Sequence, residues 1–353
     1  MQKKLIALAI AGLASSAAFA QTNVTIYGIA DAGVAYSWDG GNGGQYNVIS
    51  GGLSGSRLGF KGVEDLGNGL KALFTLEYAV NIDTGDGLGG ARQQFVGLTG
   101  GFGTVVAGRL QTAGYDFSCA AGPLGGSALN ALDKVTNTGT GAAASTLLQC
   151  GNDGRANNAI AYISPSFGGL TLAINHARVT EAAGSTAEKN DTYATLLAAN
   201  YKLGGLDAGA VYSKVNGSNP GLNADVAEYG LRASYDFTVA KVFGSWQGQE
   251  VTTATGDAGK LNHAWQAAVA VPFGKHTVIG QYAGNRIATT AAKDNSHAYT
   301  LAYTYSLSKR TTAYAGYTFV DNGNAATSVA GFDGPVIAGK DSQVVAAGLR
   351  HSF

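Results

Sequence analysis

The chain has 353 residues, a formal net charge of 0, 45% hydrophobic residues and only 13% charged residues. This charge balance offers no bulk attraction for a polyanion, so we expect no nucleic-acid partner. The 53 glycines and 5 prolines do not indicate a disordered chain, because the glycines sit inside alternating patterns and at turns. No linker or domain-sized repeat is visible, which predicts a single domain.

The N-terminus has the pattern of a secretory signal. Lys3 and Lys4 precede an apolar run over residues 5–13, and Ala18-Phe19-Ala20 supplies the small residues that a signal peptidase reads. Removing residues 1–20 leaves a mature chain of residues 21–353 and lowers the formal charge to −2. No later apolar run approaches the roughly 18–20 residues of a spanning helix, so a membrane crossing has to be made by strands.

Apolar side chains recur at every second position along much of the mature chain. In residues 228–237 the odd positions are apolar or aromatic, and the even positions are polar, charged or glycine. Residues 296–307 repeat the pattern with tyrosine and leucine on one face. A period of two predicts strands, but the alternation alone fits a soluble sandwich as well as a membrane barrel.

Sixteen such strands follow one another, which is an even number, as bacterial barrels require. The predicted strands cover residues 23–35, 46–64, 69–82, 91–100, 103–110, 155–164, 170–178, 192–203, 205–214, 225–237, 240–250, 262–272, 275–284, 295–308, 310–320 and 341–353. Tight connections such as 65–69 and 100–102 alternate with longer ones such as 83–90 and 321–340. This predicts periplasmic turns and extracellular loops. We therefore predict an all-β fold, a 16-stranded antiparallel transmembrane β-barrel.

The last strand favours the membrane interpretation. Residues 345–353 alternate to the very end of the sequence, where Phe353 closes the apolar face. A terminal amphipathic strand that ends in Phe resembles the assembly signal of outer-membrane barrels. Sixteen strands enclose a lumen too wide for side chains to fill, so the interior is expected to be a water-filled channel or to be plugged.

The longest connection, at about 111–154, contains both cysteines of the chain, Cys119 and Cys150. Export places them in an oxidising compartment, which favours a disulfide over free thiols. The bridge either simply restrains a long loop or holds that loop folded into the lumen. The loop also carries Asp116 and Asp133.

Basic residues are expected to face these carboxylates across the lumen. If Leu58 and Phe60 face lipid, strand alternation turns Arg57 and Lys61 inward, and the same argument turns Arg155 inward. The orientation of Arg109 stays open, because the preceding glycine could host a bulge. An excess of positive charge in a narrow passage favours anions. The alternative is that each arginine pairs locally with a wall carboxylate such as Glu77 or Glu228.

Motifs for catalysis are weak. Residues 85–90 match the spacing of a dinucleotide-binding loop, but neither a helix nor an acidic residue about 20 positions later follows. The five histidines lack metal-ligand spacing, and no nucleophile elbow appears. We expect no enzymatic activity, no catalytic residue, no cofactor and no metal.

Several segments together resemble the general porins of Gram-negative outer membranes, particularly the proteobacterial type. They are "VTIYGIADAGVAY", "SRLGFKGVEDLGNGLKALFTLEY", "VGLTGGFGTVVAGR", "GRANNAIAYISPSFGG" and "GLRHSF". The resemblance implies a homotrimer of sixteen-stranded barrels, each with its third extracellular loop folded inward as a constriction. It implies that Arg57, Arg109 and Arg155 form a basic cluster on the wall, with Lys61 beside it, and that Asp116 is an acidic position on the loop. The loop departs from the commonest family pattern, because it is poor in carboxylates and has two cysteines.

The expected function is passive diffusion of small hydrophilic solutes and ions across the outer membrane, with a preference for anions. The expected partners are further copies of the chain, outer-membrane lipid, the barrel assembly machinery and the solutes themselves. Two alternatives stay open: a substrate-selective porin with a true binding site, and a barrel whose surface loops bind a ligand as an adhesin does.

Overall fold

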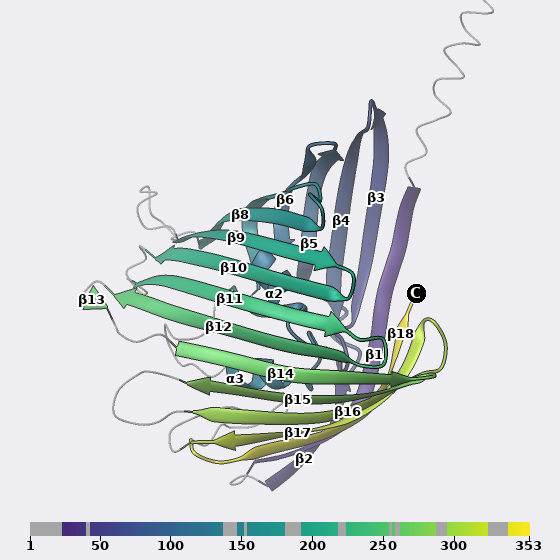
Figure 1. Ribbon diagram of the computed structural model, residues 1–353. Coiled ribbons are helices and arrows are strands. Elements are labelled where there is room, and N and C mark those ends of the chain that lie inside the picture. Colours follow the sequence, from purple (N-terminus) through teal and green to yellow (C-terminus); the bar gives the residue numbers. More distant parts are fainter. Residues whose placement is uncertain are drawn as a thin grey trace, which may run out of the picture.

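The computed structural model is a closed antiparallel β-barrel (Figure 1). It describes residues 23–39, 43–136, 147–151, 154–180, 192–217, 224–253, 256–257, 262–286, 295–323 and 338–353. The expected signal peptide, residues 1–20, lies outside the described residues. Within the described part of the chain, no helix is long and apolar enough to cross a membrane.

Each strand pairs with its neighbours in chain order, and the last strand closes the sheet on the first. The strands are β1 (Asn23–Asp39), β2 (Gly43–Ser50), β3 (Arg57–Gly67), β4 (Leu70–Val80), β5 (Leu88–Gly100), β6 (Gly103–Gln111), β7 (Arg155–Ile163), β8 (Leu170–Thr180), β9 (Thr192–Leu203), β10 (Leu206–Gly217), β11 (Ala224–Asp236), β12 (Lys241–Thr253), β13 (Gly256–Asp257), β14 (Asn262–Phe273), β15 (His276–Arg286), β16 (Ser296–Ser306), β17 (Thr311–Asn322) and β18 (Ser342–Ser352). Two helices, α2 (Ala113–Cys119) and α3 (Ala131–Thr136), lie between β6 and β7.

These labelled strands fill sixteen positions around the barrel. β3 pairs with the first part of β1 and β2 with the second part, so the two together occupy one position. β13 is a two-residue extension that pairs only with the end of β12. The predicted 16-stranded antiparallel barrel is therefore confirmed.

Strand alternation separates two faces with different burial. On β16, Leu301 is 61% exposed on the outer face, whereas its neighbours Thr300 and Ala302 are each 4% exposed on the inner face. The outward side chains are apolar or aromatic on strand after strand, as a lipid-facing surface requires. The alternation read from the sequence thus corresponds to a lipid face and an interior face.

The two helices lie on the concave side of the sheet (Figure 1). α2 contacts β6, β8, β9 and β10, and α3 contacts β14, β15 and β16. Leu124, Leu129 and Leu132 of this connection pack in a buried cluster with small apolar side chains such as Ala298 and Val344. No pattern in the sequence indicates these helices, because each has only six or seven residues.

One predicted strand is interrupted. The pattern over residues 46–64 predicts one continuous strand, but the structure ends β2 at Ser50 and begins β3 at Arg57. Gly51, with φ of 85°, turns the chain out of the sheet, and its N–H donates to the Asp31 carbonyl oxygen at 2.8 Å. We call residues 51–56 the shelf. The residues on either side keep the alternation, which is why the sequence pattern conceals the break.

Candidate functional site: an arginine-lined channel cavity

A cavity of about 970 Å³ lies between the barrel wall and the connection from β6 to β7. The wall contributes four arginines from four strands, Arg57, Arg92, Arg109 and Arg155. The connection contributes Tyr115, both cysteines and several glycines. Among the described lining residues there is no aspartate or glutamate, so the cavity is strongly basic.

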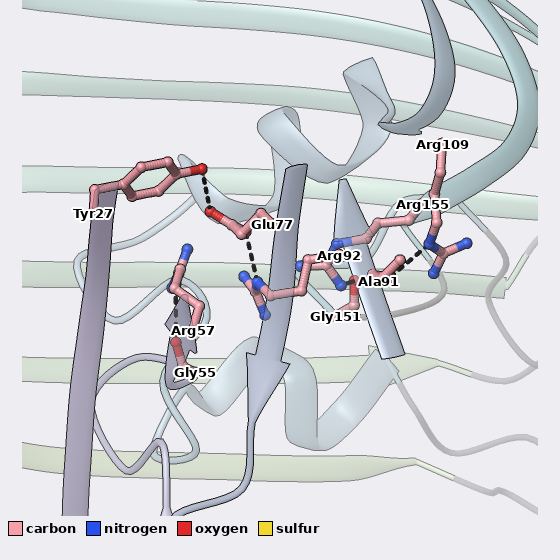
Figure 2. A network of polar contacts seen from close by, with 9 residues as sticks. All are labelled: Tyr27, Gly55, Arg57, Glu77, Ala91, Arg92, Arg109, Gly151 and Arg155. Atoms are coloured by element: carbon pink, nitrogen blue, oxygen red, sulfur yellow. Dashed lines mark hydrogen bonds and ion pairs between the residues drawn. The ribbon is translucent and has the colours of Figure 1, made fainter. Parts of the chain in front are cut away.

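Arg57 and Arg155 are held by backbone carbonyl groups. Arg57 Nε donates to the Gly55 carbonyl oxygen at 3.0 Å, and Arg155 Nη1 donates to that of Gly151 at 2.8 Å (Figure 2). The Arg155 guanidinium also lies 4.6 Å from the ring centroid of Tyr115, a cation–π distance. These contacts fix the direction of both side chains, and Glu77 lies within electrostatic range of both guanidinium groups.

Arg109 reaches the same cavity from β6. Its Nε donates to the Ala91 carbonyl oxygen at 2.7 Å, and its Nη1 donates to Asn157 Oδ1 at 2.6 Å. The sequence left its orientation open because of Gly108. Gly108 has φ of 144°, and the register between β6 and β7 shifts between Gly108 and Leu110. An irregularity at this position thus accompanies the placement of Arg109.

Arg92 is a site residue that the sequence analysis missed. Simple alternation groups it with Val96, which is 62% exposed on the outer face. However, Glu77 pairs with Gln93 and Tyr78 pairs with Ala91, so Arg92 is the extra residue of a β-bulge. A bulge redirects a side chain, and here it turns Arg92 into the cavity. No periodicity in β5 signals it.

Glu77 is the carboxylate of this network (Figure 2). Arg92 Nε donates to Glu77 Oε1 at 2.7 Å, and Tyr27 Oη donates to Glu77 Oε2 at 3.0 Å. The alternative of local pairing therefore holds for Arg92. Glu228, by contrast, accepts a hydrogen bond from the Leu147 N–H at 3.1 Å on another part of the wall.

Lys61 lies further along β3 than the cavity lining. Its Nζ lies 5.1 Å from the ring centroid of Tyr27. Lys61 pairs with Thr25 of β1 and Thr75 of β4, and it is an even number of residues from Arg57 on β3. Lys61 therefore shares the inner face with Arg57 but does not line the cavity.

The two predicted loop carboxylates lie away from the cavity lining. Asp116 of α2 has an exposed side chain, yet desolvation by the surrounding protein raises its pKa to about 6 against the opposing charge of Arg232. Asp133 of α3 lies beside β14–β16, and desolvation raises its pKa to about 6 despite a hydrogen bond from Asn130 and the charge of Lys134. Neither carboxylate is brought opposite Arg57.

Cys119 and Cys150 form a disulfide, with 4.8 Å between their Cα atoms. Both residues line the arginine cavity, so the bridge is part of its wall opposite the barrel strands. It joins the end of α2 to the segment that leads into β7, which places Gly151 beside Arg155.

Neutral side chains of the wall bind the backbone of the connection. Gln266 Nε2 donates to the Ala121 carbonyl oxygen at 3.1 Å, and Asn285 Nδ2 donates to that of Val135 at 2.7 Å. Thr300 Oγ1 and Thr318 Oγ1 donate to the Leu129 carbonyl oxygen at 2.9 and 3.3 Å. These amides and hydroxyls stand at inner positions of β14–β17, and the sequence analysis did not single them out.

The C-terminal residue takes part in barrel closure. The Phe353 N–H donates to the Gly28 carbonyl oxygen and the Gly28 N–H donates back, both at 3.1 Å. A Cβ atom at residue 28 would lie 2.6 Å from the Arg57 carbonyl oxygen and would also meet the Phe353 ring, so a glycine is needed at this position.

The fold and the basic cavity together define a barrel channel, and comparison with known proteins agrees. The model of the Gram-negative porin family matches residues 7–325. The chain therefore belongs to that family, and it is an outer-membrane diffusion channel. The relatives in this family are channels rather than enzymes.

Among its relatives, outer membrane porin protein 32 of Delftia acidovorans is 35% identical over 366 residues, covering 100% of both chains. An outer membrane porin protein of Bordetella pertussis is 28% identical, with the same full coverage. A solved structure titled as an anion-selective porin from Comamonas acidovorans matches with a TM-score of 0.78 and 30% identity, covering 94% of this chain and 100% of that one. Salmonella typhi OmpF, at 16% identity and a TM-score of 0.68, with 94% of this chain and 98% of that one covered, shares the fold.

Proposed function

We propose that the channel passes small hydrophilic solutes with a preference for anions, and that the arginine cavity sets this preference. The observation that carries the proposal is a lining with four guanidinium groups and no described carboxylate. Among the described residues, Glu77 beside Arg92 is the carboxylate of this network, so guanidinium groups outnumber carboxylates at the cavity. Two like charges about 5 Å apart in water interact by roughly 0.8 kcal/mol, so several arginines favour an anion over a cation substantially.

The way the arginines are held supports passage rather than tight binding. Arg57 and Arg155 are oriented by carbonyl oxygens, which do not cancel their charge. A passing anion meets donors that are already oriented. Because the cavity is open to solvent, water can replace the anion as it leaves. The named anion preference of the structural relative points the same way.

We further propose that residues 1–20 are removed as a signal peptide and that residues 21–353 form the mature barrel. Resemblance to the family supports a homotrimer. Phe353, at the closing strand pair, is proposed as the signal that the barrel assembly machinery reads. The segment of about 111–154, packed against inner-wall side chains, is proposed as the inward-folded constriction loop, with Arg57, Arg109 and Arg155 on the facing wall.

The test is reconstitution into a planar bilayer across a tenfold KCl gradient. A reversal potential shifted toward the equilibrium potential of chloride, with large conductance steps, supports the proposal. A reversal potential shifted toward the equilibrium potential of potassium, or well-folded protein that shows no conductance, contradicts it. Flux that saturates with one solute class would instead indicate a substrate-selective porin, since simple diffusion stays linear in concentration.

A further inference from the structure

The shelf, residues 51–56, is bound to one buried carboxylate of the barrel wall. The N–H groups of Leu53 and Ser54 donate to Asp31 Oδ2 at 2.9 and 2.7 Å. Ser56 Oγ donates to the Asp31 carbonyl oxygen at 2.9 Å and accepts from the Asp31 N–H at 3.0 Å. Asp31 is 0% exposed, and a buried carboxylate is tolerated only when its oxygens are satisfied. The shelf supplies most of the donors that Asp31 needs.

Tyr314 supplies the remaining donor from across the sheet. Its Oη donates to Asp31 Oδ1 at 2.8 Å. To reach Asp31 from β17, the side chain passes over glycines of β18, β1 and the shelf. A Cβ atom at Gly348, Gly33 or Gly52 would lie less than 3.0 Å from Tyr314 Oη, closer than real Cβ atoms approach. Three segments therefore leave space for this one phenol.

The shelf in turn carries parts of the channel cavity. Its Ser54 and Gly55 line the cavity. Gly55 accepts the hydrogen bond that orients Arg57, and Ser54 Oγ accepts a hydrogen bond from Arg350 Nε of β18 at 2.6 Å. Arg350 lies within electrostatic range of Arg57. The shelf thus directs two arginines at once.

The opposite side of the shelf contacts the connection between β6 and β7. The Gly52 carbonyl oxygen accepts from Ser127 Oγ at 2.7 Å and from the Ala128 N–H at 3.1 Å. These bonds join a wall segment to the stretch between α2 and α3. Movement of the shelf would therefore displace both the arginines and the facing loop.

We infer that the shelf is a second constriction element and that Asp31 is its positioning residue. Asp31 touches no solute. It acts through the shelf, which sets the direction of Arg57 and Arg350 and fixes the loop that faces them, and so determines how strongly the channel discriminates between anions and cations. This inference rests on the proposed anion preference.

The experiment measures reversal potential and single-channel conductance of Asp31→Asn. Asparagine has the same shape, but its NH₂ group cannot accept the hydrogen bonds that either Tyr314 or the shelf donates. Asp31→Asn also removes a negative charge near Arg350, which alone would raise the anion-to-cation permeability ratio. We expect the displacement of Arg57 and Arg350 to outweigh this, so that the ratio falls and the conductance distribution broadens. Heat-modifiable gel mobility should show that the barrel is still folded. The matched control is Ser213→Ala, which changes another fully buried inner-wall residue away from the shelf and should leave both readings unchanged.

Ser54→Ala provides a second variant, because it removes the contact to Arg350 while leaving Asp31 intact. It should lower the permeability ratio in the same direction by a smaller factor, and it decides the question if Asp31→Asn does not assemble. A folded Asp31→Asn channel, or a folded Ser54→Ala channel, with the ratio and conductance of the unchanged protein would overturn the inference. If the unchanged channel shows no anion preference, the proposed function fails. In that case conductance alone tests the role of the shelf, and a conductance distribution in Asp31→Asn equal to that of the unchanged protein would reject this role.

Discussion

The inner surface of the barrel has two walls with opposite chemistry. The arginine wall, formed by β3–β7, presents charged side chains to an open cavity. The loop wall, formed by β14–β17, presents amides, hydroxyls and small apolar side chains to the backbone of the loop. Charged groups gather at the cavity, and neutral groups of β14–β17 meet the loop, whereas Glu228 of β11 is a carboxylate that the loop also covers. The solute route that we propose therefore follows the arginine wall.

The difference has an energetic reason. A charged group under the loop would need full compensation, whereas an amide or threonine needs a single partner, which the loop carbonyl groups provide. Arg57, Arg92 and Arg109 are partly exposed at the cavity, and the buried Arg155 is held by the Gly151 carbonyl oxygen and the Tyr115 ring. The experiments below test whether the two walls are separable in this way.

The largest effect is expected from removing the disulfide within the loop. Replacing both Cys119 and Cys150 by Ser should destabilise the loop by roughly 3–4 kcal/mol in the chain-entropy model, given their separation of 31 residues. We expect noisier conductance and faster proteolysis within the loop, with the barrel intact. Reducing the unchanged protein should have the same effect, and adding the reductant to the variant, which has no disulfide, controls for side effects of the reagent. Traces identical to those of the unchanged protein would show that the bridge does not brace the loop.

A core substitution on the loop wall should follow in size. Leu129 is 1% exposed in the cluster that joins loop and barrel, and Leu129→Ala should cost about 3 kcal/mol. Larger conductance with faster loop proteolysis is expected. Leu349→Ala, which removes the same atoms from a side chain that is 47% exposed on the outer face, is the control. If both variants behave alike, the loop does not depend on this wall.

On the arginine wall, Glu77→Gln should strengthen anion preference. The substitution removes the carboxylate beside Arg92 but keeps an acceptor for it, and one charge at about 5 Å is worth roughly 0.8 kcal/mol. The permeability ratio should rise about threefold. Tyr27→Phe, which removes a hydrogen bond to Glu77 without changing charge, serves as the control. A lower ratio in Glu77→Gln would mean that Glu77 matters mainly for holding Arg92 in place.

The smallest effect is expected from pH. The pKa values of Asp116 and Asp133 are raised to about 6, so both lose their negative charge as pH falls from 7 to 5. Anion preference should therefore increase modestly on acidification. Reversal potentials measured at both pH values test this, and the Asp116→Asn, Asp133→Asn double variant should remove most of the change. An equal change in that variant would assign the effect to other groups.

The sequence was sufficient for features that repeat and insufficient for features that interrupt the repeat. The strand at 192–203 was predicted to the residue, because its alternation and flanking turns are regular. The shelf was missed because the side chains from Arg57 onward alternate as they would in one continuous strand from residue 46. Arg92 was missed because a bulge reverses its face, and no local pattern reports a bulge. The loop wall was missed because isolated amides and alanines at inner positions become meaningful only when a distant loop lies against them.

The most direct test of the account is the reversal potential of the Arg57→Gln, Arg155→Gln double variant in a tenfold KCl gradient. Arg310→Gln, on an exposed turn outside the cavity, is the charge-matched control for one substitution. The account predicts that the permeability ratio falls about tenfold in the double variant, from roughly 0.8 kcal/mol per charge, while Arg310→Gln stays near the unchanged protein. A double variant that folds, conducts and keeps the original reversal potential would contradict the claim that the arginine wall selects the solute.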